Sequence, residues 1–262
     1  MPHPTSPRTA PDTPGRVLLD VDARGVAHVR LARPDKLNAL TFGMLDDLVS
    51  AGRLLRKDRT LRAVILSGEG DAFCAGLDVR AALGDPAGIA RRFVPRPLPL
   101  PRTNVFQEAC WTWRRLPVPV VAAVHGHCLG AGLQLALGAD LRFSTSDARW
   151  SVREATWGLV PDMTGIRTLT ELMGLDVAKE LTLTARMVEG SEAERLGLVT
   201  RVAQDPVAAA QEVVSEMIQH DRRALAHAKR LLNAAPGQRA GRIFGRERLA
   251  QLRLLRRVAG RG

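Results

Sequence analysis

Two glycine-bearing turns, each placed directly after an apolar run, constrain this chain more than any other feature. The first turn is FCAGLD at residues 73–78, and it follows the run RAVILSG at 62–68. The second is HGHCLGAGLQ at residues 125–134, and it follows VPVVAAV at 118–124. Short apolar runs are typical of buried strands, and small residues after a strand let a ligand approach the backbone. Two such turns can aim two backbone N–H groups at one point, which is how an enzyme holds a developing oxyanion or enolate.

Two acidic residues follow the second turn and are candidates for acid/base chemistry. They are Glu154 and Asp162. A carboxylate in an apolar pocket has a raised pKa and can both take up and return a proton. The competing interpretations are structural, namely a salt bridge of Glu154 to Arg153 or another neighbour, and a helix cap by Asp162. His125 and His127 invite a metal interpretation, but they show no paired ligand pattern, so we expect no metal site.

The spacing of apolar residues predicts a mixed α/β chain in which strands and helices recur over the first two-thirds. Residues 17–21 and 26–31 alternate around a short turn, which predicts a β-hairpin. Further strands are expected at 63–67, 118–124, 140–144 and 149–152, and helices at 41–56, 104–116 and 133–137. In the last third, helices are expected at 169–173, 177–183, 207–219, 222–234 and 242–258. We therefore predict a core at 16–200 and a C-terminal helical region at 201–262 that is not an independent domain.

Two segments are expected to lie outside regular structure. Residues 83–102 include the run PRPLPLP at 95–101, which cannot be helical because proline lacks the N–H donor, so we predict a mobile loop or pocket wall. Residues 1–15 are rich in Pro, Ser and Thr and lack the apolar core of a signal peptide, which predicts a disordered lead. No stretch approaches the roughly 20 apolar residues of a membrane span, so we expect no membrane partner.

The charge and the cysteine content limit the class of partner and the compartment. The net charge is +11, and many of the arginines lie near the C-terminus. A nucleic-acid binder can have this charge, but the chain has no Tyr and no recognisable nucleic-acid motif, so nucleic acid is disfavoured. A basic face that attracts an anionic small molecule, or an arginine-rich coding bias, would give the same composition.

Three cysteines without CxxC spacing predict reduced thiols and a cytoplasmic location. Cys74 and Cys128 lie inside the two turns, where either could be a nucleophile. The favoured interpretation of both is a small buried hydrophobe, because free cysteine is among the most buried residue types.

Six motifs occur in a fixed order along the chain. They are RPDKLNAL at 33–40, AFCAGLD at 72–78, PVVAAVHG at 119–126, LGAG at 129–132, WGLVP at 157–161 and AERLGLV at 193–199. In this order and spacing they make the chain resemble the crotonase superfamily, also called the enoyl-CoA hydratase/isomerase family, from about residue 17 to about 235. The resemblance implies a spiral core of ββα units. It also implies C-terminal helices that pack in a homotrimer, often doubled to a hexamer, and an acyl-CoA thioester as substrate.

The resemblance also implies roles for particular residues. The thioester oxygen would lie between the backbone N–H groups of Leu77 and Ala131, the positions that match the family's oxyanion hole. Coenzyme A would be carried as part of the substrate, with no separate cofactor. The residues expected to border it are Lys36, Ala39, Ala75, Asp78 and Arg80. The cationic members of this set could meet its phosphates, which would give part of the net charge a use.

The acid/base set departs from the hydratase pattern at Gln134. Family hydratases use two glutamates, of which one aligns with Glu154 and the other with Gln134. A glutamine can orient a water or a substrate, but it has no titratable proton near neutral pH. Asp162 aligns with an active-site aspartate of the dienoyl-CoA isomerases and of the dehalogenase branch. The resemblance therefore implies weak hydration or migration of a double bond.

Three functions stay open at this point. The leading one is a cytoplasmic enoyl-CoA hydratase/isomerase family enzyme that acts on an unsaturated acyl-CoA through an enolate held in the oxyanion hole. The second is thioester hydrolysis, or other chemistry on the same fold, with Asp162 as nucleophile or base. The third is a non-catalytic or RNA-binding protein that has kept the fold, an option that the substitution at Gln134 leaves open.

Overall fold

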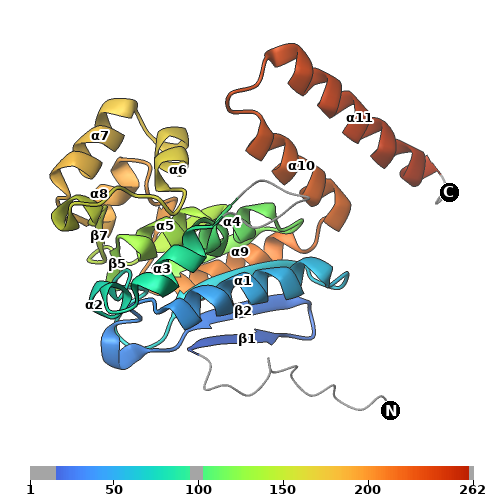
Figure 1. The fold of residues 1–262 in the computed structure, drawn as a ribbon. Helices are drawn as coiled ribbons and strands as arrows, with labels where there is room; N and C mark the ends of the chain where they lie inside the picture. The colour runs from blue at the N-terminus through green and yellow to red at the C-terminus, as the bar shows by residue number, and fades with distance from the viewer. Residues whose placement is uncertain (1–15, 95–102, 260–262) are drawn as a thin grey trace, which may run out of the picture.

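The computed structural model describes residues 16–94 and 103–259 and shows two sheets surrounded by helices (Figure 1). The larger sheet has the strand order β1-β2-β3-β4-β6-β9. Its strands are β1 (Val17–Val21), β2 (Val26–Leu31), β3 (Ala63–Gly68), β4 (Val120–Val124), β6 (Leu141–Ser144) and β9 (Arg201–Val202). Strands β1 and β2 form the predicted antiparallel hairpin, and every later pairing in this sheet is parallel. The predicted α/β class is confirmed.

A smaller sheet is formed by β5 (His127–Leu129), β7 (Arg149–Ser151) and β8 (Val188–Glu189). Strand β5 lies inside the second glycine turn, where the sequence predicted no strand. Its three residues, between two glycines, are too few to show the alternation that identifies a strand. Strands β8 and β9 in the last third were missed because two residues are too few to show a period of two.

The helices account for most of the remaining described chain. They are α1 (Phe42–Lys57), α2 (Val79–Leu83), α3 (Pro86–Phe93), α4 (Val105–Arg115), α5 (Ala131–Leu137), α6 (Gly165–Leu172), α7 (Leu175–Thr184), α8 (Gly190–Arg195), α9 (Pro206–Met217), α10 (Arg222–Ala234) and α11 (Ala240–Ala259). Two single turns of 3-10 helix are η1 (Pro34–Lys36) and η2 (Glu154–Trp157). Side-chain caps explain several of the starts, since Thr41, Asn104 and Asp205 each accept a backbone N–H of the first helical turn.

The core lies on both faces of the larger sheet, and the alternation along β3 shows how. Val64 and Leu66 point into the main cluster of buried residues, to which α1 and α4 contribute, whereas Ala63 and Ile65 point to the opposite face. That second face is covered by α9, which packs against β3, β4 and β6. The period of two in a fully buried strand is what a sheet between two helical layers requires.

The loop predicted over residues 83–102 is wrong for residues 86–93, which form α3. Asp85 accepts the N–H of Gly88 and Pro86 occupies the first helical turn, so this segment carries a strong helix-start signal. The proline content of the longer segment outweighed that signal in the sequence interpretation. Residues 95–102 and the predicted disordered lead at 1–15 lie outside the described residues.

The C-terminal helices α10 and α11 pack against each other and extend away from the sheets (Figure 1, red). Helix α11 carries several large apolar side chains that are at least half exposed, among them Phe244, Leu249, Leu252 and Leu255. The predicted homotrimer and the domain boundary near residue 200 stay predictions. Within the described ranges, no helix combines the length and the apolar character needed to cross a membrane.

Candidate active site

The two glycine turns lie against each other, as the family resemblance implied. Cys74 in the first turn and Cys128 in the second form a parallel β-bridge. The N–H of Cys74 donates to the His127 carbonyl (2.8 Å), and the N–H of Leu129 donates to the Cys74 carbonyl (3.0 Å). Gly132 permits this approach, because a Cβ there would lie only 2.5 Å from the Cys74 carbonyl oxygen. The contact between the turns therefore depends on backbone pairing and on one missing methyl group.

Gly132→Ala is expected to lower the free energy of unfolding by about 1–3 kcal/mol, because the added methyl group would overlap the carbonyl oxygen and the side chain of Cys74. Urea unfolding followed by circular dichroism measures this change. Gly241→Ala in α11 is the matched control, since a Cβ there has no atom within 4 Å. Equal stabilities of the two variants would show that the first turn can move away from α5 at no cost.

Where the turns meet, the backbone N–H groups of Leu77 and Ala131 have no hydrogen-bond acceptor among the described residues. Gly76 has φ of 103°, and on either side of Leu77 the backbone is bonded to Leu40 through the Gly76 carbonyl and the Asp78 N–H. The Leu77 N–H itself donates to no described residue. Ala131 is the first residue of α5, so its N–H has no acceptor within the helix. A Cβ on Gly76 would lie 3.8 Å from the Ala131 nitrogen, which places both turns at one small region.

Glu154 lies beside the second turn and is held there by Gln134. A Cβ on Gly130 would lie 3.4 Å from the Oε1 atom of Glu154. The Nε2 atom of Gln134 donates to the same Oε1 (2.6 Å). The Gln134 Oε1 atom accepts the N–H groups of Met163 (2.8 Å) and Gly165 (2.9 Å). The glutamine, which is 1% exposed, thus joins α5, the carboxylate and the start of α6.

The backbone at Thr164 makes this double acceptance possible. Thr164 has φ of 79° and ψ of 2°, a left-handed conformation that a β-branched residue rarely adopts. This conformation directs the N–H groups on both sides of Thr164, those of Met163 and Gly165, at the single Gln134 oxygen. Asp162 immediately precedes this segment. The strain at Thr164 is therefore offset by contacts that also fix the backbone next to Asp162.

Burial raises the pKa of the Glu154 carboxyl above its usual value. The hydrogen bonds from its own backbone N–H and from Gln134 oppose that rise, whereas the charge of Asp162 adds to it. The pKa of Asp162 is also raised by burial. The Oε2 atom of Glu154 is buried and has no hydrogen-bond partner among the described residues. Two partly buried carboxyls with raised pKa values lie near each other, as proton transfer at neutral pH requires.

Neither structural interpretation of the two acids is realised. Glu154 forms no ion pair within the described ranges. The residue that caps α6 is Thr164, and no side chain makes the cap hydrogen bond, so Asp162 does not serve as the cap. Neither side chain is committed to holding a helix end or a salt bridge.

Glu154→Gln is expected to raise the free energy of unfolding at neutral pH and to leave it nearly unchanged at acid pH. A carboxyl whose folded pKa is raised above its unfolded value binds its proton more tightly in the folded state. Stability is therefore greatest below the unfolded pKa and falls as the pH rises through the folded pKa. The amide mimics the protonated form and escapes this loss. Urea unfolding at both pH values measures the change in unfolding free energy. A variant less stable than the native protein at neutral pH would contradict the prediction.

The residues predicted to border coenzyme A lie on two adjoining segments. The Ala75 N–H donates to the Leu37 carbonyl (2.9 Å), which brings residues 33–40 onto the first turn. Lys36 and Arg80 are exposed, whereas Ala39, Ala75 and Asp78 are partly buried. Asp78 caps α2 and forms an ion pair with Arg33 (2.8 Å), which holds its pKa below the usual value.

Sequence reasoning missed the residue that fixes this region, Asn38. Asn38 is fully buried with φ of 56°, and its side chain accepts the N–H of Arg33 and donates to the carbonyls of Glu69 and Ala72. Asparagine tolerates the left-handed region better than most residues. A polar residue between Leu37 and Ala39 in the first motif was the sequence feature that could have indicated this role.

The three cysteines are buried, and His125 contacts a backbone carbonyl. Cys74, Cys110 and Cys128 are free and buried, and burial raises the pKa of Cys74 to about 12, so the interpretation as small buried hydrophobes is confirmed. His125 Nε2 lies 2.7 Å from the Gly70 carbonyl oxygen. Across residues 16–94 and 103–259, no group of three His, Cys, Asp or Glu side chains could hold a metal ion.

The family model for enoyl-CoA hydratase/isomerase matches residues 22–242, which is most of the chain. The chain belongs to the enoyl-CoA hydratase/isomerase family. The mouse mitochondrial Delta(3,5)-Delta(2,4)-dienoyl-CoA isomerase is 35% identical over 187 residues, which cover 69% of this chain and 56% of that protein. The chain thus spans little more than half the length of this curated relative.

Solved structures of family members confirm the predicted crotonase-type fold. An enoyl-CoA hydratase from Mycobacterium smegmatis superposes with a TM-score of 0.77 at 31% identity, covering 90% of each chain. A Thermobifida fusca YX protein solved in complex with acetoacetyl-CoA gives a TM-score of 0.81 at 32% identity, covering 93% of this chain and 96% of that one. The resemblance inferred from the six motifs is therefore correct.

Proposed function

We propose that this family member moves a double bond along an unsaturated acyl-CoA, with a 3,5-dienoyl-CoA as its preferred substrate. The observation that carries the proposal is the engagement of Gln134. Its amide holds Glu154 and the segment before α6, and it supplies no proton. The second titratable group near Glu154 is Asp162, whose charge raises the pKa of Glu154. The site thus offers two carboxyls for a proton shuttle.

The geometry supports a division of labour between the two acids. The thioester oxygen accepts hydrogen bonds from the N–H groups of Leu77 and Ala131, which makes the α-carbon acidic. Glu154 lies beside Gly130, next to the Ala131 N–H, so it is the acid nearer the α-carbon. Glu154 takes the α-proton, and the electrons of that C–H bond move into a conjugated enolate. The reactive form is the one in which Asp162 carries the proton and Glu154 is ionised, because protonation of Asp162 removes the charge that raises the pKa of Glu154. Asp162 then delivers its proton to the far end of the conjugated system, and solvent restores both carboxyls.

Hydration makes a different demand that this site meets poorly. Addition of water requires one group that takes a proton from the water and another that delivers a proton to the α-carbon. A glutamine whose amide oxygen already accepts two backbone N–H groups has no lone pair left to take a proton from water. The name of the mouse relative, a dienoyl-CoA isomerase, agrees with the preference for isomerisation.

A direct competition of substrates tests the proposal. The full chain is supplied with a 3,5-dienoyl-CoA and, separately, with crotonyl-CoA, and formation of the 2,4-dienoyl thioester is compared with loss of the enoyl thioester. We expect kcat/KM for isomerisation to exceed that for hydration by at least about 100-fold, since a missing acid/base group costs about that factor. Hydration as fast as isomerisation would refute the assignment.

We also propose that residues 33–40 and 75–80 hold the coenzyme A portion of the substrate. The contact of these segments with the first turn, and the exposed cations Lys36 and Arg80, support this role. The complex of the Thermobifida fusca relative with acetoacetyl-CoA is consistent with it. A homotrimer and a cytoplasmic location remain part of the proposal on the strength of the sequence resemblance and the reduced cysteines.

A further inference from the structure

A cavity separate from the candidate active site opens between α4 and α10. Its volume is about 490 Å³, which falls in the range of small-molecule pockets. Five cationic side chains line it, namely Arg114, Arg115, Arg223, Lys229 and Arg230. None of its described lining residues belongs to the acid/base pair, to the two glycine turns or to the proposed coenzyme A wall.

Two of the five cations are neutralised and belong to the framework of the wall. Arg115 bonds to both carboxylate oxygens of Glu108 at 2.8 Å. Lys229 pairs with Asp140 (2.7 Å) and donates to the carbonyls of Trp113 and Val118. The charges of these side chains are compensated by fixed acidic partners. They therefore shape the cavity but contribute little to its positive electrostatic potential.

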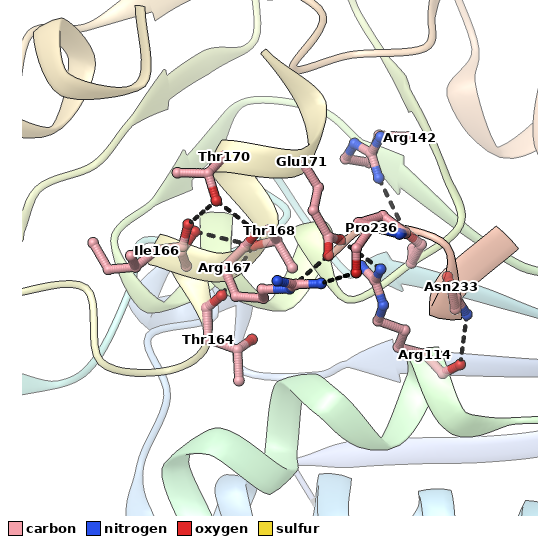
Figure 2. A network of polar contacts seen from close by, with 12 residues as sticks. Arg114, Arg142, Thr164, Ile166, Arg167, Thr168, Thr170, Glu171, Asn233 and Pro236 are labelled. Atoms are coloured by element: carbon pink, nitrogen blue, oxygen red, sulfur yellow. Dashed lines mark hydrogen bonds and ion pairs between the residues drawn. The ribbon is translucent and has the colours of Figure 1, made fainter. Parts of the chain in front are cut away.

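Arg114 is only partly neutralised in the network of Figure 2, which ties α4 to α6 and to the end of α10. Glu171 of α6 pairs with Arg114 and with Arg167. Arg167 also donates to the Pro236 carbonyl (3.1 Å), and Asn233 donates to the Arg114 carbonyl (3.2 Å). The two cations share one carboxylate here, so this edge of the cavity keeps an excess positive charge.

The remaining two cations, Arg223 and Arg230, form no ion pair with any described residue. They stand seven positions apart on α10, so they lie on one face of the helix with His227 between them. Arg230 lies 2.7 Å from the Nδ1 atom of His227, and because an arginine can only donate, that nitrogen is an unprotonated acceptor. Burial lowers the pKa of His227, and the charges of Arg230 and Arg253 lower it further.

The face of α10 that carries Arg223, His227 and Arg230 lines the cavity. Both arginines are exposed, so their guanidinium groups lie where an anion can reach them from solvent. Trp111 lines the same cavity, with the Arg114 guanidinium 5.0 Å above its ring. Paired arginines and an aromatic wall are the features that recognise phosphate groups on a compact organic molecule.

We propose that the α4–α10 cavity binds a phosphate-bearing anion of nucleotide size, with Arg223 and Arg230 as the groups that hold its phosphates. The bound anion neutralises the two arginines and lies against Trp111. The phosphate can belong to a free nucleotide or to the nucleotide end of a coenzyme A molecule. This site is independent of the proposed isomerisation, since it shares no residue with that site.

Calorimetric titration of the full chain with inorganic pyrophosphate, followed by competition with ADP and with free coenzyme A, tests the proposal. We expect one saturable pyrophosphate site, weakened at least about tenfold in the double variant Arg223→Gln, Arg230→Gln, because each charge-assisted hydrogen bond contributes about that factor. The control is Arg242→Gln, Arg246→Gln, which removes the same charge from exposed positions of α11 and is expected to change the affinity less than twofold. Displacement by ADP alone identifies a free nucleotide, and displacement by both identifies the shared nucleotide group.

Equal weakening in the two double variants would overturn the proposal, because it would show attraction to the basic surface in general. The absence of saturable binding would overturn it as well. A second readout is the pKa of His227, followed by NMR. An anion near the imidazole stabilises its protonated form against Arg223, Arg230 and Arg253, so the pKa is expected to rise at saturating pyrophosphate. An unchanged pKa would place the anion elsewhere. Neither measurement depends on isomerase activity, so failure of one proposal is distinguishable from failure of the other.

Discussion

Replacing Glu154 by Gln is expected to lower kcat for double-bond migration by about 1,000-fold, with little change in KM. The variant keeps the size of the side chain and can still accept the hydrogen bond from Gln134 (2.6 Å in the native protein). It loses the group that takes the α-proton, and a positioned general base contributes about 100- to 10,000-fold to a rate. Steady-state kinetics with a 3,5-dienoyl-CoA measure both constants.

The control for this variant is Glu212→Gln, an exposed position on α9 that carries the same chemical change. Its kcat is expected to stay within twofold of the native value. The native enzyme should also lose kcat/KM below the raised pKa of Glu154, because the base must be ionised to take a proton. Native-like turnover in Glu154→Gln would remove this residue from the mechanism.

The two glycine turns could be located from the sequence because each follows an apolar run, which is a local signal. The choice of Leu77 and Ala131 within them came from the family resemblance and stays a prediction. The pairing of Cys74 with Cys128, which brings the turns together, is non-local. Only the family resemblance supplied it, since spacing alone does not say that two turns meet.

The support around the acids could not be predicted in the same way. Gln134 was expected to orient a water or a substrate, and in the structure its amide holds Glu154 and the N–H groups beside Thr164. That contact depends on the left-handed conformation of Thr164, for which a threonine gives no sequence signal. The cavity at α10 was missed because the periodicity of one helix does not say which other helix lies opposite Arg223 and Arg230.

The position of α3 shows a different kind of error, in which the signal was present and was outweighed. Asp85 and Pro86 form a helix start of the same kind as Asp205 and Pro206, which begin the helix expected at 207–219. The prolines farther along the segment led to a single loop interpretation for residues 83–102, although residues 86–93 are helical. Shorter windows at each Asp-Pro pair would have found the helix.

Asp162→Asn is expected to abolish double-bond migration, with kcat about 100- to 1,000-fold lower, while leaving the first half of the reaction intact. Asp162 is assigned to the far end of the conjugated system, so its loss stops proton delivery there. Glu154 remains beside Gly130 and can still remove and return the α-proton. In heavy water the variant should therefore exchange the α-hydrogen of the dienoyl thioester without isomerising it, which mass spectrometry detects.

The same experiment separates isomerisation from thioester hydrolysis. If Asp162 were a nucleophile or base for hydrolysis, the native protein would release free coenzyme A thiol from the substrate and the variant would not. The shuttle mechanism predicts negligible thiol release from either protein. It also predicts that Glu154→Gln, unlike Asp162→Asn, leaves the α-hydrogen unexchanged in heavy water. Exchange retained in Glu154→Gln and lost in Asp162→Asn would reverse the two assignments, because the acid nearer the Ala131 N–H would then serve the remote carbon.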